Sequence, residues 1–505
     1  MNPISPNQAL WNVLDFGAAR DGQTSDTAAL QAAIDACAQA GGGTVYVPAG
    51  TYLTGSLFLK SNLTLFLDAG AVLLGSQQAA DYPLIDHRWE GVQQQAHAPL
   101  VGGDQLENVA IVGRGAIDGR GAYWRDQLRN GTLAHPRPRL VSFSRSRNVL
   151  LEGCTLTNSP SWTFHPFNCE NVTVDKVTIV NPARSPNTDG INPESCRNVH
   201  IANCHVDVGD DCVTIKSGTE HDREHLLSCE NITVTNCTMV HGHGGVVIGS
   251  EMSGDVRNVV ISNCIFMGTD RGIRLKSRRE RGGVVEDIRV TNVVMKDVLC
   301  PFIMNLYYGC GAWGTDKISD KAPWPVNEGT PRFRRIHFSG ISAREVHYAA
   351  AFIYGLPEMF VEDVSFSDVA VSMAVDAEAG DPAMAPDMEP MRRAGFFACN
   401  TRGLRFDNVE VTDHLGPAVA LSGVQDVDIS NCTTHTPNAD PVVQMRQVED
   451  AFVHGCRAVK GTGAFLRLEG EKTKGVLLSG NDFGRAGQSI SLADDVRVDA
   501  VVERA

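Results

Sequence analysis

The chain has 505 residues, of which 43% are hydrophobic and 20% are charged, a composition that excludes intrinsic disorder as its main state. The formal net charge is −15, so we expect no nucleic-acid partner, and no apolar run approaches the roughly 20 residues of a membrane span. Glycine is frequent (49 residues) and aromatic residues make up only 7%, which indicates many tight turns between short strands.

The first predicted element is a helix over residues 26–37, which are rich in strong helix formers. Ser25 or Asp26 can cap its start, and the glycines at 41–43 can end it. One face of this helix is apolar and carries Leu30, Ala33, Ile34 and Cys37. We predict that residues 1–45 form an N-terminal cap over the open end of a solenoid.

A short sequence motif recurs along the rest of the chain. Apolar and polar residues alternate within it. Between residues 148 and 287 the copies are about 23 to 33 residues apart, an interval in the solenoid range. The alternation predicts strands of about four or five residues with one buried face. We therefore predict an all-β chain that forms one right-handed parallel β-helix domain over residues 1–505. A β-propeller is the alternative, but its blades need about 40 residues. Clear copies begin at Asn148, Asn198, Asn231 and Asn258.

The fourteen cysteines contain no CxxC pair, so we expect buried thiols and no zinc site. Residues 1–8 have neither the basic nor the apolar region of a secretion signal, which favours a cytoplasmic protein without disulfides. If a signal peptide has been removed, the protein would instead be secreted or periplasmic.

Two acidic clusters are candidates for chemistry. Asp189 closes the phrase Asn187-Thr-Asp189, and Asp210 and Asp211 follow 21 residues later, which is about one coil. Neighbouring strands lie about 4.8 Å apart, so the three side chains should lie close together. Three acids at such a distance oppose full ionisation, and a proton donor beside a carboxylate is what glycosidic cleavage needs. Structural turns are the alternative explanation for each cluster alone.

Further candidate residues follow the acidic clusters on later coils at near-equal spacing. His243 lies between two glycines 32 residues after Asp211, and Arg274 and Tyr307 follow at intervals of 31 and 33 residues. In residues 271–281 the cations Arg274, Lys276 and Arg278 alternate with other residues, which predicts that all three lie on one strand face. A planar carboxylate would relieve their mutual repulsion, whereas a solvated charge run is the alternative.

Together these motifs resemble glycoside hydrolase family 28, the polygalacturonases, and in particular its bacterial exo-acting members. The resemblance covers most of the chain and rests on Asn-Thr-Asp at 187–189, Asp-Asp at 210–211, Gly-His-Gly at 242–244 and Arg-Leu-Lys at 274–276. Phrases at 15–18, 116–119 and 158–166 also look like this family. The resemblance implies the pectin-lyase-like form of the parallel β-helix.

By this resemblance Asp210 is the general acid, while Asp189 and Asp211 hold and deprotonate the attacking water. His243 would tune the acid and contact the sugar. The resemblance further implies a set of substrate-binding residues: Arg274 and Lys276 for a substrate carboxylate, Tyr307 (or the adjacent Tyr308) for the sugar, with Asn187, His165 and Arg278.

The implied reaction is hydrolysis of α-1,4-galacturonosyl bonds in oligogalacturonides or pectin-derived carbohydrate, with inversion and with no cofactor or metal. Inversion predicts acid and base carboxyl groups roughly 6.5–9.5 Å apart. A cytoplasmic enzyme would meet imported oligomers, which favours exo action with release of galacturonic acid. The alternatives are a rhamnogalacturonan or xylogalacturonan hydrolase of the same family, a calcium-dependent β-helix pectate lyase and a non-catalytic β-helix adhesin. The sequence leaves the oligomeric state open.

Overall fold

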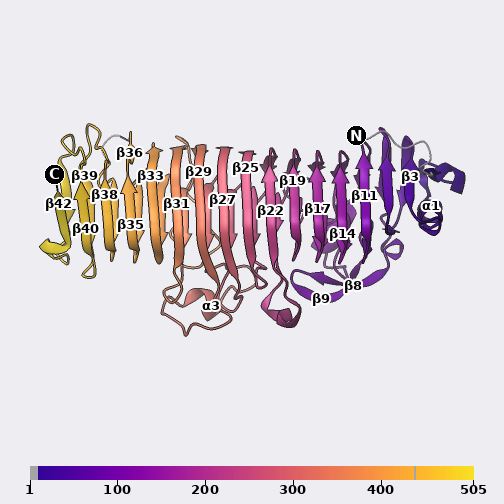
Figure 1. Cartoon of the computed structure of the whole chain (residues 1–505), viewed down its shortest axis with the longest axis horizontal. Coiled ribbons are helices and arrows are strands. Elements are labelled where there is room, and N and C mark those ends of the chain that lie inside the picture. The colour runs from indigo at the N-terminus through magenta and orange to yellow at the C-terminus, as the bar shows by residue number, and fades with distance from the viewer. Residues whose placement is uncertain (1–9, 437–438, 505) are drawn as a thin grey trace. The chain divides into compact units, whose positions relative to one another are not determined.

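The computed structural model describes residues 10–436 and 439–504. They fall into two compact units that divide between His243 and Gly244, and each unit is a stack of parallel strands (Figure 1). The predicted right-handed parallel β-helix is confirmed as the fold class. The prediction that both units form one domain stays a prediction. None of the helices in the described ranges is long and apolar enough to cross a membrane.

The first unit has three rows of parallel strands. One row joins β1 (Leu10–Asn12), β3 (Gly43–Val47), β6 (Leu63–Leu67), β11 (Glu107–Gly113), β14 (Arg147–Glu152), β17 (Glu170–Asp175), β19 (Arg197–Ala202) and β22 (Cys229–Thr235). A second row joins β2 (Asp21–Ser25), β4 (Gly50–Thr54), β7 (Ala71–Gly75), β12 (Ala116–Asp118), β15 (Thr155–Thr157), β18 (Thr178–Val180), β20 (His205–Val208) and β23 (Thr238–His241).

The third row of the first unit carries the surface of interest for function. It joins β5 (Leu57–Phe58), β10 (Val101–Asp104), β13 (Val141–Ser144) and β16 (Phe164–Phe167). Bridges at Ile191 extend this row to β21 (Val213–Ile215). An antiparallel hairpin, β8 (Leu84–Trp89) and β9 (Val92–His97), departs from the coil pattern.

The second unit has two strand rows. The longer strands are β25 (Val256–Met267), β27 (Val284–Lys296), β29 (Arg332–Val346), β31 (Val361–Met373) and β33 (Thr401–Thr412), followed by β35 (Gln425–Ser430), β36 (Thr433–Thr434), β38 (Glu449–His454), β40 (Lys474–Ser479) and β42 (Val501–Arg504). The other row joins β24 (Val246–Gly249), β26 (Arg271–Lys276), β28 (Cys300–Asn305), β30 (Ala349–Tyr354), β32 (Ala394–Cys399), β34 (Val419–Ser422), β37 (Val443–Arg446), β39 (Ala464–Glu469) and β41 (Gln488–Leu492).

The predicted N-terminal helix is confirmed as α1 (Thr27–Gln39), which packs against β1, β3 and β5 with Leu30, Ala33, Ile34 and Cys37 buried. The predicted side-chain cap is wrong in one respect. Asp26 is the capping residue by position, but its carboxylate accepts hydrogen bonds from the backbone N–H groups of Ala19 (2.6 Å) and Arg20 (3.1 Å) instead. The remaining helical segments in the described ranges are short: α2 (Ala122–Arg129), α3 (Asp316–Ser319), η1 (Val13–Phe16), η2 (Ala79–Asp81), η3 (Glu220–His225) and η4 (Val498–Ala500).

The recurrent asparagines form a ladder along the first unit. Each donates a side-chain hydrogen bond of 2.9–3.0 Å to the side-chain oxygen of the asparagine one coil earlier. All have positive φ, between 55° and 61° for the five donors, a conformation that asparagine tolerates better than most residues. The ladder therefore fixes one turn of each coil. Its members are Asn62, Asn108, Asn148, Asn171, Asn198 and Asn231.

The cysteines also stack between coils. The backbone N–H of Cys169 donates to the sulfur of Cys196 (3.4 Å), and the N–H of Cys196 donates to the sulfur of Cys229 (3.3 Å). All fourteen cysteines are thiols, and twelve are buried, as the composition predicted; Cys310 is exposed and Cys399 is partly exposed.

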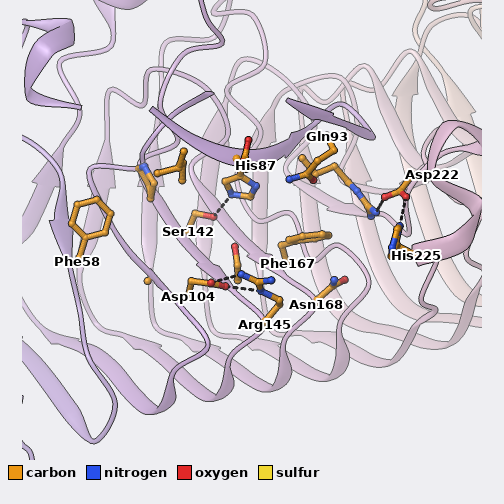
Figure 2. A pocket seen from close by; sticks show the side chains of 16 residues that line it. Phe58, His87, Gln93, Asp104, Ser142, Arg145, Phe167, Asn168, Asp222 and His225 are labelled. Atoms are coloured by element: carbon orange, nitrogen blue, oxygen red, sulfur yellow. Dashed lines mark hydrogen bonds and ion pairs between the residues drawn. The ribbon is translucent and has the colours of Figure 1, made fainter. Parts of the chain in front are cut away.

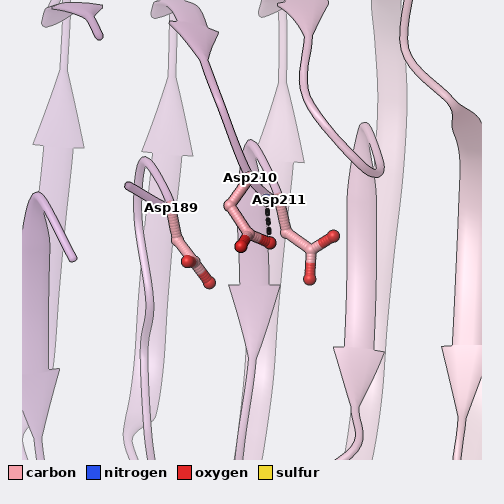
Figure 3. Close-up of side chains that lie close together, drawn as sticks. All are labelled: Asp189, Asp210 and Asp211. Atoms are coloured by element: carbon pink, nitrogen blue, oxygen red, sulfur yellow. Dashed lines mark hydrogen bonds between the residues drawn. The ribbon is translucent and has the colours of Figure 1, made fainter. Parts of the chain in front are cut away.

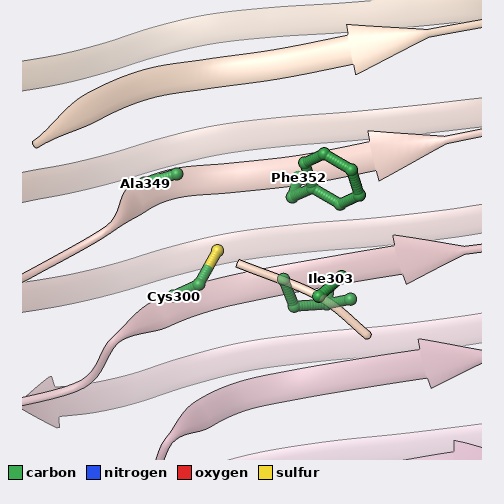
Figure 4. Close-up of a cluster of buried hydrophobic side chains, with 5 residues drawn as sticks. Cys300, Ile303, Ala349 and Phe352 are labelled. Atoms are coloured by element: carbon green, nitrogen blue, oxygen red, sulfur yellow. The ribbon is translucent and has the colours of Figure 1, made fainter. Parts of the chain in front are cut away.

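The loop of residues 374–393, which is rich in methionine, proline and acidic residues, packs against a buried cluster of the second unit. Cys300, Ile303, Ala349 and Phe352 form a buried cluster on β28 and β30 (Figure 4). Ala383, Met388 and Met391 of this loop pack against that cluster. The loop therefore serves as a cover for the apolar outer face of these strands.

Candidate active site

The structure brings Asp189, Asp210 and Asp211 together at the start of neighbouring strands of the third row (Figure 3). Asp189 precedes the bridge at Ile191, and Asp210 and Asp211 precede β21. One oxygen from each carboxylate lies within 4.8 Å of the other two. The one-coil spacing in the sequence is therefore reproduced as close contact between the two clusters.

The three carboxylates differ in exposure and in hydrogen bonding. Asp189 and Asp211 are 3% and 1% exposed, whereas Asp210 is half-buried. Asp189 Oδ2 accepts hydrogen bonds from Asn192 Nδ2 (3.0 Å) and Thr214 Oγ1 (3.1 Å). Asp210 is therefore the carboxylate of the cluster that a ligand reaches most directly.

Backbone N–H groups orient Asp210 on both sides. Its Oδ1 accepts from the N–H of Asp211 (2.9 Å), and its Oδ2 accepts from the N–H of Asn187 (3.2 Å). Asn187 itself has a φ of 54°. Because two donors from adjacent coils hold one carboxylate, its direction is set by the backbone and not by side-chain packing alone.

The spacing of the carboxylates is closer than we expected. The sequence interpretation gave roughly 6.5–9.5 Å between acid and base, the distance typical of inverting enzymes, but the nearest oxygens are within 4.8 Å. That rule describes one acid and one base with a water between them, whereas this site has three acids. Such a cluster could also share a cation, since carboxylate oxygens are the ligands that hard cations prefer.

Arg137 is a site residue that the sequence analysis missed. It is buried and donates hydrogen bonds to the carbonyl oxygens of Pro160 (2.8 Å) and Pro186 (3.0 Å) and to Asn187 Oδ1 (2.6 Å). Burial lowers the pKa of Arg137 to about 10. The residue thus holds the loop whose backbone orients Asp210. An arginine next to prolines is its only sequence signal, and that signal does not distinguish a buried arginine from an exposed one.

His243 and Gly242 lie beside the acidic cluster. The side chain of His243 is exposed, and its backbone N–H donates to the carbonyl oxygen of Asp210 (3.2 Å). Gly242 has a φ of 74°, and a Cβ at this position would come within 2.3 Å of the same carbonyl oxygen. Gly242 is therefore required by the close approach of two backbone segments.

His165 does not reach the surface, which corrects its predicted role as a substrate contact. It is fully buried, and its Nε2 forms a hydrogen bond with Glu194 Oε2 (3.0 Å). Burial, with the nearby charges of Arg139 and Lys216, holds the pKa of His165 well below its usual value. Glu194 also accepts from Arg88, so His165 belongs to a buried polar cluster beneath the hairpin.

The β8–β9 hairpin is fixed tightly beside the acidic cluster. Arg88, which is 2% exposed, forms ion pairs with Glu194 (3.3 Å) and with Asp222 of η3. Trp89 stacks on Trp162 with ring centroids 5.7 Å apart. At the tip, Glu90 Oε1 accepts from Asn187 Nδ2 at 3.5 Å.

In the second unit, Arg274 and Lys276 share one face of β26, as their period-two spacing predicted. Both lie over the ring of Tyr308, at 5.7 and 5.3 Å from its centroid. Arg278 lies beyond the end of β26 at Lys276, and its backbone forms an antiparallel bridge with Tyr307, so the strand periodicity does not extend to it and its place on this face stays a prediction.

Tyr307 occupies a different environment from its neighbour. Its ring is 1% exposed and lies under Lys321 (3.9 Å) and Arg279 (5.5 Å). Arg279 in turn pairs with Glu358 (2.6 Å). This packing makes Tyr307 part of the structural support of the loop that contains α3.

Comparison with known proteins identifies the family of the chain. The sequence profile of glycosyl hydrolases family 28 matches residues 37–324. A probable polygalacturonase of Vitis vinifera is 36% identical over 378 residues, which are 73% of this chain and 75% of that protein. An exo-poly-α-D-galacturonosidase of Dickeya chrysanthemi is 29% identical over 419 residues, 72% of this chain and 69% of that protein.

Solved structures give the same result. The crystal structure of a hyperthermoactive exopolygalacturonase from Thermotoga maritima superimposes with a TM-score of 0.65 at 32% identity, over 74% of this chain and 89% of that chain. Three clustered acids can supply the acid and the base that glycosidic hydrolysis needs. The chain belongs to glycosyl hydrolases family 28, the polygalacturonase family. Because this is a family of hydrolases, the lyase and adhesin hypotheses are set aside.

Proposed function

We propose that the protein hydrolyses α-1,4-galacturonosyl bonds of oligogalacturonides, acts from a chain end and releases galacturonic acid. The observation that carries this proposal is the cluster of three carboxylates in which one, Asp210, is the most exposed and is held by two backbone N–H donors. A general acid has to reach the leaving oxygen in a defined direction, and Asp210 meets both conditions.

In this mechanism Asp189 and Asp211 hold the attacking water and remove its proton. Both are nearly buried, and Asp189 is oriented by two side-chain donors, so a water between them would have a fixed position. The limit of 4.8 Å applies to one oxygen of each carboxylate, whereas the separation typical of inverting enzymes is that of the carboxyl groups. We therefore propose inversion at the anomeric carbon despite the short spacing.

Substrate charge is recognised by Arg274 and Lys276. An arginine and a lysine on one strand face suit a galacturonate carboxylate, because charge-assisted hydrogen bonds to carboxylates are strong and directional. Tyr308 lies against both cations, whereas Tyr307 is enclosed by Lys321 and Arg279. We assign the sugar contact to Tyr308 in place of Tyr307.

Exo action is supported by the β8–β9 hairpin. Its tip contacts Asn187, the residue whose backbone orients Asp210, and buried ion pairs fix the hairpin in place. A polymer that crossed this side of the cluster would have to displace Glu90 and break the contacts of Trp89 and Arg88. A terminal sugar requires no such displacement.

The test is a time course on a defined hexagalacturonate, with product lengths and anomeric configuration followed by chromatography and NMR. We expect galacturonic acid from the first time point, a slow fall in mean chain length and an inverted first product. Early fragments of intermediate length would contradict exo action. A retained first product would contradict the shared-water mechanism.

A further inference from the structure

A cavity lies in the first unit, between the third strand row and the β8–β9 hairpin (Figure 2). Its volume is about 750 Å³, within the range of roughly 300–1,000 Å³ that is typical of ligand sites. Each of four adjacent strands contributes to its floor, β5 through Phe58 and β16 through Phe167 among them. The three aspartates of the acidic cluster do not line it.

We propose that this cavity is a second carbohydrate-binding site, which takes a neutral disaccharide rather than a uronate. The inference goes beyond the proposed hydrolysis, since it concerns a separate site and does not depend on the position of cleavage. It rests on three properties of the lining residues: their charge balance, their neutral hydrogen-bonding groups and their aromatic surface.

The charge balance of the cavity disfavours an anion. Its two arginines, Arg88 and Arg145, are outnumbered by three carboxylates. Arg145 pairs with both oxygens of Asp104, with Nε to Oδ1 at 2.8 Å, and Arg88 pairs with Asp222 and with Glu194. A uronate would therefore enter a site whose arginines and carboxylates sum to 2 − 3 = −1 and whose arginines already have carboxylate partners.

His87, in the roof, adds no positive charge to the cavity. Its ring is nearly buried and faces Ser142 across a hydrogen bond of 3.3 Å (Figure 2). Burial holds the pKa of His87 well below its usual value, and the charges of Arg139, Arg88 and Arg145 act in the same direction. The imidazole is thus neutral and offers hydrogen bonding alone.

Neutral polar groups suited to sugar hydroxyls line the rest of the cavity. The side-chain oxygen of Asn168 is buried and accepts no hydrogen bond from the described residues, so a ligand hydroxyl could supply one. Gln93 of the hairpin is exposed at the opposite wall. Phe58 provides partly exposed aromatic surface for the C–H face of a pyranose ring, whereas the ring of Phe167 already lies under the guanidinium of Arg88 at 4.8 Å.

The dimensions fit two linked rings. The floor extends over four strands, and three spacings of about 4.8 Å make it roughly 14 Å long. The tip of the hairpin lies outside the cavity: Glu90 contacts Asn187 of the active site and does not line the cavity. A ligand in the cavity therefore leaves the acidic cluster open, and the site could hold a neutral branch of the polysaccharide during cleavage.

The experiment compares two disaccharides that differ only at C6: α-1,4-galactobiose, which is neutral, and α-1,4-digalacturonate. We expect galactobiose to bind the wild-type protein in calorimetry without lowering kcat/KM for trigalacturonate. Asn168→Gly keeps the backbone conformation of Asn168 (φ 51°) and removes the amide. It should weaken galactobiose binding roughly fivefold, the value of about one hydrogen bond. Gln93→Ala, at an exposed position, should act in the same direction.

Asn203→Gly is the matched control, since Asn203 has the same backbone conformation (φ 58°) and lies outside the cavity. The inference is overturned if galactobiose does not bind, if it competes with trigalacturonate, or if Asn168→Gly and Gln93→Ala bind it as tightly as Asn203→Gly does. Failure of the proposed function is visible separately, as absence of trigalacturonate hydrolysis by the wild-type protein.

Discussion

At the scale of single residues, the acidic cluster combines one partly exposed carboxylate with two buried ones. The backbone N–H groups of Asn187 and Asp211 hold Asp210 from two coils, and Arg137 holds the loop that carries Asn187. The catalytic geometry therefore depends on Arg137 as a positioning residue, although its guanidinium contacts no substrate in the proposed mechanism.

We expect Asp189→Asn, Asp210→Asn and Asp211→Asn each to lower kcat by about 10²–10⁴-fold, the usual contribution of general acid–base catalysis. Turnover of trigalacturonate measures the loss, and circular dichroism checks that each variant is folded. Asp207→Asn, on β20 outside the cluster, is the control and should keep its activity. Near-wild-type turnover in any of the three would remove that residue from the mechanism.

The two adjacent tyrosines and the cations of β26 give a second prediction. Lys276→Met should lower kcat/KM about tenfold, because a charge-assisted hydrogen bond is worth roughly 1.5–3 kcal/mol. Tyr308→Ala should also lower kcat/KM, and because Tyr308 is itself buried (7% exposed) it should lower Tm as well. Tyr307→Ala should mainly lower Tm, because it empties a buried position between Lys321 and Arg279. Equal cleavage of methyl-esterified and free oligomers would contradict the carboxylate contact.

The ion pair that anchors the hairpin should make stability depend on pH. Burial alone raises the pKa of Asp222, but hydrogen bonds from His225 and Arg88 outweigh it and hold this pKa below 3.8. Such a carboxyl contributes its full stabilisation at pH values above its unfolded-state pKa of about 3.8. This contribution is lost as the pH falls through the lower pKa of the folded state. We expect Asp222→Asn to lower Tm at pH 5 and to differ less from wild type at pH 3.

Glu224→Gln is the control for this measurement, because Glu224 is an exposed carboxylate of the same short helix, η3. It should leave Tm unchanged at both values of pH. A constant difference between wild type and Asp222→Asn from pH 5 to pH 3 would show that the ionised carboxylate of Asp222 does not anchor the hairpin.

At the scale of secondary-structure elements, much of the fold could be predicted because its signals are local or periodic. The α1 helix was evident from its composition, and the coil-to-coil approach of Asp189 and Asp210 followed from their 21-residue spacing. The burial of His165 and the end of β26 before Arg278 could not be predicted in this way. They depend on the β8–β9 hairpin and on a loop, whose contacts join residues far apart in the chain.

The asparagine ladder allows a stability prediction at this scale. Asn171 donates to Asn148 and accepts from Asn198, both at 3.0 Å, and has a φ of 57°. Asn171→Ala loses both hydrogen bonds and places a Cβ in the left-handed region, so we expect a loss of about 1–2 kcal/mol in unfolding free energy. Asn171→Gly keeps the backbone relaxed and should lose about half as much. Equal losses in urea denaturation would contradict a role for the backbone conformation.

At the scale of the whole molecule, the cysteines predict a graded thiol reactivity. Thiolates are the reactive form, and burial raises the pKa of Cys37 to about 11 and of Cys154 and Cys300 to about 12. In the native protein we expect rapid labelling of Cys310 alone, because it is exposed. After unfolding without reductant, nearly all fourteen thiols should react. Several unreactive pairs in the unfolded chain would indicate disulfides.

The β8–β9 hairpin also bears on how such enzymes diversify. It contributes no member of the acidic cluster, and it is anchored through Arg88 to residues of other coils. If exo action holds as proposed, a change in the length of the hairpin tip would alter which part of a polymer reaches the acids, while Arg88 at its base would keep its ion pairs. Chain-end and internal cleavage could then diverge through a segment that carries none of the three acids.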